Sequence, residues 1–389
     1  MLISLTKPKS TGTILAGNMV LNILVIMAVG LFMVYDATGP KASYNSGISL
    51  QFIKQLTWNL LGLICFFSIL QMLSIELLKK SAPYFGALVL ILLAGVLVLG
   101  HEIKGASRWY RLGEISFQPS EMAKIFSVVF FAWYLDKHKE SMHKWYGMLP
   151  CMLLILTTVG LIAAEPDLGN AVLLFVVLVS MLYIAGARIG HLLTLLALTL
   201  PGFCYIMLTK FDHIKKRLNV FINPEDHLNT GAYQGHQALI AIGSGGGMGK
   251  GVGSGLQKLY YLPEAHNDFI FAIIGEDFGF VGCSLTVLLY AFLVWYAIQV
   301  CTRCTQLFSL LLAYGITFVF AGQALFNMSV VTGVVPNKGI SLPLISYGGS
   351  NALFTLIGLG ILVRLTKNLP PEVPRELGAL RIHKPQKIF

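Results

Sequence analysis

Residues 210–268 read KFDHIKKRLNVFINPEDHLNTGAYQGHQALIAIGSGGGMGKGVGSGLQKLYYLPEAHND, a polar, glycine-rich stretch in a chain that is otherwise mostly apolar. Lipid cannot host this stretch as exposed irregular backbone, because each unsatisfied peptide group in hydrocarbon costs several kcal/mol. The stretch must therefore lie at a membrane face or in a water-filled cavity. Loops that a rigid scaffold holds often carry binding and catalytic residues, so we expect the functional residues in and around it.

The composition is that of a polytopic membrane protein. Of 389 residues, 56% are hydrophobic and only 12% are charged, about half the charged share of a soluble domain. The apolar runs do not alternate with polar faces as the helices of a soluble protein do. The net charge of +10 does not indicate nucleic-acid binding, because no dense basic run with interleaved aromatic residues is present.

Ten apolar runs are long enough to cross a hydrocarbon core of about 30 Å, which takes about 20 residues. They cover residues 14–35, 55–74, 83–100, 120–136, 147–164, 170–187, 190–209, 270–300, 307–328 and 344–365. The eighth run is too long for one simple span. Its first part, 269–280, contains Glu276 and Asp277, so we expect this part to be re-entrant or interfacial. Pro201 and Gly202 predict a kink in the seventh run. The predicted fold is an all-α polytopic membrane protein with a large loop between helices seven and eight.

The distribution of lysine and arginine sets the orientation of the spans. With the N-terminus inside, the inner segments hold more basic residues than the short outer loops. We therefore expect both termini in the cytoplasm and the loop 210–268 outside. The predicted organisation is a cytoplasmic segment 1–13, a ten-helix membrane domain 14–369 and a basic cytoplasmic tail 370–389.

Charged residues gather at the outer end of the fourth run. Arg108 lies in the loop before it, and Glu121 and Lys124 are three residues apart, so they share a helical face and can pair. Two interpretations stay open: a structural ion pair near the membrane surface, or a polar floor for a charged headgroup. Ionisable residues within spans favour a bundle interior or a wet cavity.

Two further outer segments hold polar candidates. The turn between the fifth and sixth runs contains Glu165 and Asp167, which are either solvated or able to bind a cation or orient a substrate. The segment 335–351 contains Lys338 and Ser346. Its small residues permit close helix packing, and Lys338 adds a cation to the outer face.

Within the long loop, the basic segment around Arg217 suits an anionic headgroup or a pyrophosphate, with a solvated charge run as the alternative. The glycine-rich run 243–255 is not a nucleotide loop. Lys250 is followed by Gly251 rather than by Ser or Thr, and no GxGxxG register fits. We expect a tightly turning backbone that approaches a ligand closely.

The loop ends with three titratable residues, Glu264, His266 and Asp268, at the mouth of the eighth run. A carboxylate between water and membrane can have a raised pKa, because burial disfavours its charge. Such a group suits a general base near neutral pH. The alternative is a helix cap at Asp268 with the other two residues solvated. Capping and catalysis are compatible.

The segments GASRW, FQPSEMAK, EPDLGNA, KKRLNVFINP, QKLYYLPEAHNDFIFAIIGEDFGFVG and PNKGISLPLISYGGSN, in this order, resemble the SEDS family (shape, elongation, division, sporulation). The resemblance covers nearly the whole chain and favours the members that act in division over those that act in elongation. The family commonly has Thr at the positions of Asn267 and Asn337, and Glu at Asp277. These differences keep polarity and bear on fine geometry rather than on the reaction class.

The resemblance implies a ten-span bacterial glycosyltransferase that polymerises lipid II outside the cytoplasm. The family's essential loop aspartate falls on Asp268, its span-four pair on Glu121 and Lys124, its loop arginine on Arg217 and its outer lysine on Lys338. It implies a place in the cytoplasmic membrane, with the division septum favoured, and as partners a class B penicillin-binding protein, which is a transpeptidase, and other division proteins.

No cofactor is predicted with certainty, and a divalent cation that assists the reaction stays open. Cys301 and Cys304 have CxxC spacing without a second pair or a nearby histidine pair, so we predict no zinc site. Three other functions also stay open. They are a lipid flippase or transporter, which usually shows paired broken helices, an elongation polymerase of the same family, and a non-catalytic scaffold.

Overall fold

The structure, a computed structural model, describes residues 11–43, 49–103, 106–113, 115–194, 196–197, 201, 215, 219–227, 232–336 and 339–370. Nine of the ten predicted spans fall on helices of this part of the chain. These helices are α1 (Thr11–Ser43), α2 (Leu50–Met72), α3 (Ile75–Leu99), α4 (Pro119–Lys137), α5 (Trp145–Ala164), α6 (Leu168–Ile184), α10 (Ile270–Arg303), α11 (Leu307–Val331) and α12 (Gly349–Leu365). The seventh predicted span, with its predicted kink, lies mostly outside the described residues.

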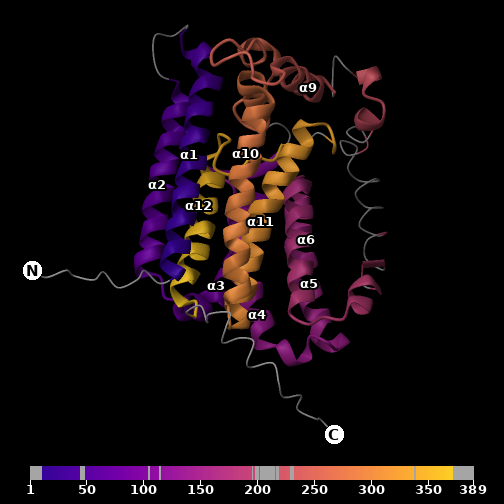
Figure 1. The fold of residues 1–389 in the computed structure, drawn as a ribbon. Helices are drawn as coiled ribbons and strands as arrows, with labels where there is room; N and C mark the ends of the chain where they lie inside the picture. The colour runs from indigo at the N-terminus through magenta and orange to yellow at the C-terminus, as the bar shows by residue number, and fades with distance from the viewer. Residues whose placement is uncertain are drawn as a thin grey trace, which may run out of the picture.

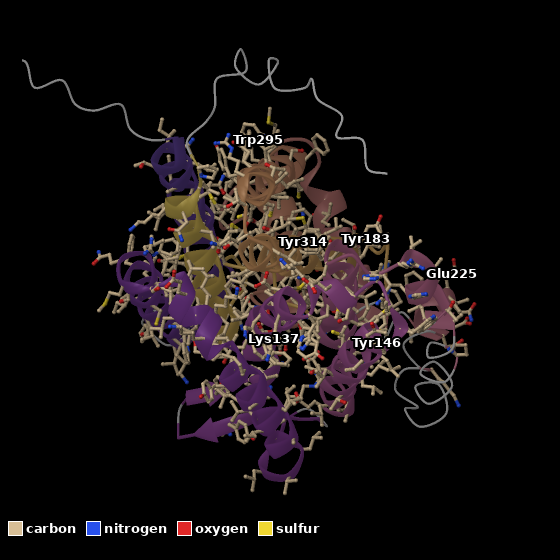
Figure 2. The ribbon with its side chains drawn as sticks, turned by 90° about the horizontal axis from the view of Figure 1, so that it is seen from below. Lys137, Tyr146, Tyr183, Glu225, Trp295 and Tyr314 are labelled. Carbon is tan, nitrogen blue, oxygen red and sulfur yellow. The ribbon has the colours of Figure 1, made fainter. Side chains whose placement is uncertain are left out.

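The described helices form one bundle (Figure 1), which confirms the predicted class of polytopic membrane protein. Seven of them are long and apolar enough to cross a membrane, and α6 is a shorter apolar helix. Large apolar side chains project from the perimeter of the bundle, as Trp295 does in the view from below (Figure 2). The start of α1 and the turn η4 (Thr366–Asn368) contact each other at one end of the bundle. The first and the last described residues therefore lie at the same end of the bundle (Figure 1).

A three-stranded antiparallel sheet follows α3, where the sequence analysis predicted only a loop. Its strands are β1 (His101–Ile103), β2 (Ala106–Leu112) and β3 (Ile115–Phe117), with β2 in the middle. Gly113, in the turn between β2 and β3, has φ 62°, a left-handed conformation that glycine adopts without strain. Tyr110 fastens the sheet to α3 by donating its hydroxyl to Leu92 O (3.0 Å). The sheet thereby holds Arg108 at one end of the bundle.

The helix α10 is not continuous, because the chain folds back at Gly279. This glycine has φ 64° and ψ −156° within the helical range. A Cβ built on Gly275 would lie 3.3 Å from Cys283 Sγ, whereas eight residues of straight helix would separate them by about 12 Å. Residues 270–277 are all buried in the protein. They form a half-helix inside the bundle, an arrangement that fits the re-entrant alternative better than the interfacial one.

The glycine-rich run packs on this half-helix together with α9 (Tyr233–Gly245), a helix that the sequence analysis did not predict. Phe280 N donates to Gly246 O (2.9 Å), which satisfies an amide just after the break. Gly249 has φ 83°, and a Cβ on it would overlap Asp277 O. The sequence predicted that these glycines let the backbone approach a ligand closely. In the structure they let the backbone approach α10 closely.

The segment between α11 and α12 stays non-helical inside the bundle. It covers residues 339–348, and its leucines and isoleucines are buried. A Cβ on Gly30 of α1 would overlap Leu344 O, so this glycine permits the segment to pack closely on α1. Tyr290 of α10 donates its hydroxyl to Pro343 O. The backbone groups of such a segment need partners from side chains, and those partners shape the candidate site.

Candidate functional site

Asp268, the predicted general base, lies two residues before the half-helix of α10 and is partly exposed. The N-cap of this helix is Phe269 rather than Asp268, the cap that the sequence offered as an alternative. One buried side chain of α11 fixes its backbone. Asn327 Nδ2 donates both to Asp268 O (2.8 Å) and to Ile340 O (2.7 Å). Because both hydrogen bonds come from one nitrogen, a single side chain sets the distance between the end of the long loop and the segment 339–348.

The same two segments meet again beside Asp268. Tyr347 N donates to His266 O (2.9 Å), and the rings of these two residues lie 5.6 Å apart between centroids. On the other side, a Cβ built on Gly339 would overlap Oδ2 of Asp268. Gly339 is exposed, so the carboxylate lies next to solvent-accessible backbone rather than against packed core.

Gln323 lies one turn before Asn327 on α11 and has a similar role. Its Nε2 donates to Ser341 O (3.0 Å), and its Oε1 accepts a hydrogen bond from Lys124 Nζ (2.6 Å). The two amides are four residues apart, so they lie on one face of the helix. The sequence analysis did not single them out, although polar amides with helical spacing in an apolar run are a usable signal of contact between helices.

The predicted pairing of Glu121 with Lys124 is confirmed. Lys124 Nζ lies 2.9 Å from Glu121 Oε2, and both side chains are nearly inaccessible. A buried ion pair is stable only when its remaining hydrogen-bonding groups are satisfied. Asn351 (2.8 Å) and Asn170 (3.3 Å) donate to the glutamate, and Gln323 accepts from the lysine. The pair therefore joins α4, α6, α11 and α12 inside the bundle.

Ser346 stabilises the bend of the segment 339–348. Its Oγ accepts a hydrogen bond from Leu342 N (2.8 Å), and its backbone oxygen accepts one from Gln55 Nε2 (3.4 Å). Gln55 Oε1 also accepts from Gly348 N (3.0 Å). The serine hydroxyl thus bonds the backbone of its own segment, and both α2 and α11 hold that segment by side-chain hydrogen bonds.

Arg108 and Glu165 meet through the backbone at the turn between α5 and α6. Arg108 Nε donates to Glu165 O (2.8 Å), and Nη2 donates to Pro166 O (2.5 Å). The Glu165 carboxylate is fully buried, and neither of its oxygens has a hydrogen-bond partner among the described residues. Burial, with a smaller contribution from Asp167, raises the pKa of Glu165 to about 8, and the Arg108 guanidinium opposes this shift.

Asp167 ties the same turn to the start of α4. Its Oδ2 accepts hydrogen bonds from Asn170 Nδ2 (2.8 Å), Ser120 Oγ (3.1 Å) and Gln118 Nε2 (3.1 Å). Both acids of the turn are buried, so the predicted alternative of a solvated turn is wrong. The turn is joined to Glu121 through Asn170, whose Nδ2 donates to both carboxylates.

Replacing Glu165 with Gln should stabilise the protein at alkaline pH and change little at acidic pH. The folded protein keeps this proton up to about pH 8, whereas the carboxyl group ordinarily loses it near 4.5. Stability therefore falls as the pH rises through this window, and Gln mimics the protonated acid throughout. We expect a gain of roughly 1–3 kcal/mol near pH 8.5 and under about 0.5 kcal/mol near pH 5.

Thermal unfolding in detergent at both pH values measures this effect. Glu225→Gln, at an exposed position on the turn η2 (Glu225–His227) marked in Figure 2, is the matched control. An equal shift of the melting temperature at both pH values would show that the charge of Glu165 is not the cause.

Two predicted cations, Arg217 and Lys338, lie outside the described residues. Their predicted contacts with a charged headgroup therefore stay predictions. Within the described ranges, no three His, Cys, Asp or Glu side chains gather as a metal site would require.

Comparisons with known proteins agree with this arrangement. The family of cell cycle proteins that comprises FtsW, RodA and SpoVE matches residues 17–370. The chain is 35% identical over 350 residues to a probable peptidoglycan glycosyltransferase FtsW of Geobacter sp. (strain M18). The match covers 89% of this chain and 95% of the relative.

Solved structures show the same fold. One is a chain from a study of structural coordination of polymerization and crosslinking by a peptidoglycan synthase complex, with a TM-score of 0.74, 28% identity and coverage of 90% of this chain and 97% of that one. Another is the rod shape determining protein RodA of Thermus thermophilus, with a TM-score of 0.66, 27% identity and coverage of 91% and 97%.

Proposed function

Because this chain belongs to the family of cell cycle proteins that comprises FtsW, RodA and SpoVE, we propose that it is a peptidoglycan glycosyltransferase. It polymerises lipid II into glycan strands at the outer face of the cytoplasmic membrane. The observation that carries this proposal is the place of Asp268, a partly exposed carboxylate at the start of a buried half-helix. Its backbone is held by Asn327 and it lies beside the exposed Gly339.

In the proposed reaction the Asp268 carboxylate is the general base. It takes the proton of the acceptor sugar's 4-hydroxyl while that oxygen bonds to the anomeric carbon of the donor. The bond from this carbon to undecaprenyl pyrophosphate breaks, and the pyrophosphate keeps the electron pair. Direct displacement inverts the anomeric centre and needs one base and a good leaving group. A second carboxylic acid is not required, because pyrophosphate leaves unprotonated once its charge is neutralised.

Two of the candidate cations are described, and both are bonded to protein groups. Lys124 binds Glu121 and Gln323, and Arg108 binds the carbonyls of the turn at Glu165. We assign these two to the polar floor of the site. Arg217 and Lys338 are proposed to meet the pyrophosphate, as the family resemblance implies. A divalent cation that assists this step stays a prediction, which polymerisation assays with and without a chelator test.

The protein is embedded in the membrane, and we propose that it acts at the division septum. The relatives named FtsW support this role, and the similarity to a chain of a peptidoglycan synthase complex supports a partner. The proposed partner is a class B penicillin-binding protein, whose transpeptidase activity would crosslink the new strands. In this proposal both termini are cytoplasmic.

Incubation of the purified protein with labelled lipid II, with and without its cognate transpeptidase, tests the function. We expect glycan polymer on a sizing gel, with more of it when the partner is present. A parallel assay of lipid II movement across vesicles distinguishes a flippase. Translocation without any polymer under both conditions would reject the glycosyltransferase.

A further inference from the structure

A buried lysine binds two aspartates from distant parts of the chain. Lys258 lies in the π-helical turn η3 (Gln257–Tyr261). Its Nζ is 2.5 Å from Asp36 Oδ2 on α1 and 2.8 Å from Asp277 Oδ2 on α10. The side chains of Lys258 and Asp277 are fully buried, and that of Asp36 is 7% exposed. The proposed reaction gives this cluster no chemical step.

Packing alone does not account for such a cluster. Burying ionised groups is costly, and well-packed apolar residues often stabilise a protein as well or better. The lysine bonds one oxygen of Asp36 and both oxygens of Asp277 (3.0 and 2.8 Å). Charge-assisted hydrogen bonds of this kind are directional. The cluster therefore sets the relative position of α1, η3 and the half-helix more narrowly than apolar contacts would.

The neighbouring acid, Glu276, holds the same loop to the half-helix. Its fully buried carboxylate accepts hydrogen bonds from Leu256 N (2.9 Å) and Gln257 N (3.2 Å), and Lys250 Nζ lies 3.3 Å from it. Glu276 and Asp277, which end the half-helix, are thus both used to fasten the chain that leads into Lys258.

Asp268 lies in the chain between Lys258 and Asp277. The half-helix 270–277 connects it rigidly to Asp277, because a buried helix moves as one body. Contacts at Asp277 therefore set the direction in which the half-helix presents Asp268, and Asn327 fixes the other end. The α1 helix braces both sides, since its Asp36 binds Lys258 and its Gly30 packs on Leu344 of the facing segment.

We infer that Asp36, Lys258 and Asp277 form a positioning clamp for Asp268. The clamp orients the half-helix so that the carboxylate of Asp268 meets the acceptor hydroxyl, and it acts without touching the substrate. The inference rests on the proposed function of Asp268 as general base. Its effect on rate can be large, because a displacement of about 1 Å at a reacting group can cost about 100-fold.

Lys258→Met, assayed in complex with the partner transpeptidase, tests the clamp. We expect kcat for lipid II polymerisation to fall about 10- to 100-fold, with KM changed by less than about twofold. Lys258→Arg keeps the charge and should recover part of kcat. Asp36→Asn should have a smaller effect, because Asp277 still binds the ammonium group. Hydrogen-exchange mass spectrometry should show faster exchange of the amides of residues 262–268 in Lys258→Met.

The matched control is Lys79→Met. It removes an ion pair of similar length, 2.5 Å to Asp136, near the end of α4 far from Glu121, and it should leave kcat and the exchange of residues 262–268 unchanged. If Lys258→Met only melts earlier, with kcat and exchange within about twofold of wild type, the clamp is overturned.

Failure of the clamp is distinguishable from failure of the proposed function. If the wild-type complex makes no polymer, the proposed function fails. In that case, comparing the amide exchange rates of residues 262–268 between wild type and Lys258→Met still tests whether Lys258 holds this part of the loop. If Lys258→Met does not fold, kcat and exchange are measured on Asp36→Asn instead, and wild-type values of both in that variant overturn the clamp.

Discussion

Replacement of Asp268 by Asn is expected to lower the rate of lipid II polymerisation by about 10²- to 10⁴-fold, the usual contribution of a positioned general base. The amide has nearly the same shape as the carboxylate but cannot take the acceptor's proton. The half-helix of α10 starts at Ile270, two residues after Asp268. The partial positive charge of its N-terminus favours the charged carboxylate, and the amide gains no such benefit.

Folding should survive this change, because the bond that fixes Asp268 to α11 uses its backbone oxygen. The measurement is gel sizing of glycan made from labelled lipid II by the purified protein with its partner. Asp226→Asn removes the same charge from an exposed position on η2 and is the control. Glycan of near-normal amount and length from Asp268→Asn would reject the assignment.

The second large effect is expected from Gly339→Ala. The added methyl group would overlap Oδ2 of Asp268, so the carboxylate must move away from its position in the site. We expect a loss of activity of about 10- to 100-fold, the cost of a small misplacement of a reacting group. Stability should change little, because Gly339 is exposed and the atom that the methyl group meets is the end of a side chain.

Gly243→Ala is the matched control for this change, because a Cβ on Gly243 of α9 meets no atom within 4 Å. Polymerisation and thermal unfolding measured on both variants separate the two outcomes. If Gly339→Ala polymerises lipid II at the wild-type rate, the carboxylate of Asp268 does not act as the base from the position beside Gly339. The proposed base would then have to be sought elsewhere.

Local patterns predicted a large part of the fold. Runs of apolar residues located nine helices that the structure describes, because a segment that crosses lipid must satisfy its backbone groups within a helix. The spacing of Glu121 and Lys124 predicted a pair that the structure contains, since residues three apart share a helical face. Two acids within residues 269–280 predicted a segment that does not simply span, and the chain folds back at Gly279.

Contacts between distant segments could not be predicted in this way. Lys258 and Asp36 are 222 residues apart, and nothing in the surroundings of either residue indicates the other. The hydrogen bonds of Asn327 depend on a segment whose path only the packed bundle defines. The sheet of β1, β2 and β3 was not predicted, because its strands are short. The predicted roles of Arg217 and Lys338 stay predictions.

The non-helical segment 339–348 also constrains how the protein is made. Its backbone depends on side chains of other helices: Gln323 and Asn327 of α11 bond Ser341 O and Ile340 O, and Gln55 of α2 bonds Ser346 O. Until those helices have entered the bilayer and packed together, the backbone groups of the segment have no hydrogen-bond partners in the hydrocarbon. We expect it to settle last during biogenesis, so that a nascent chain becomes competent for chemistry only after its whole membrane domain has assembled.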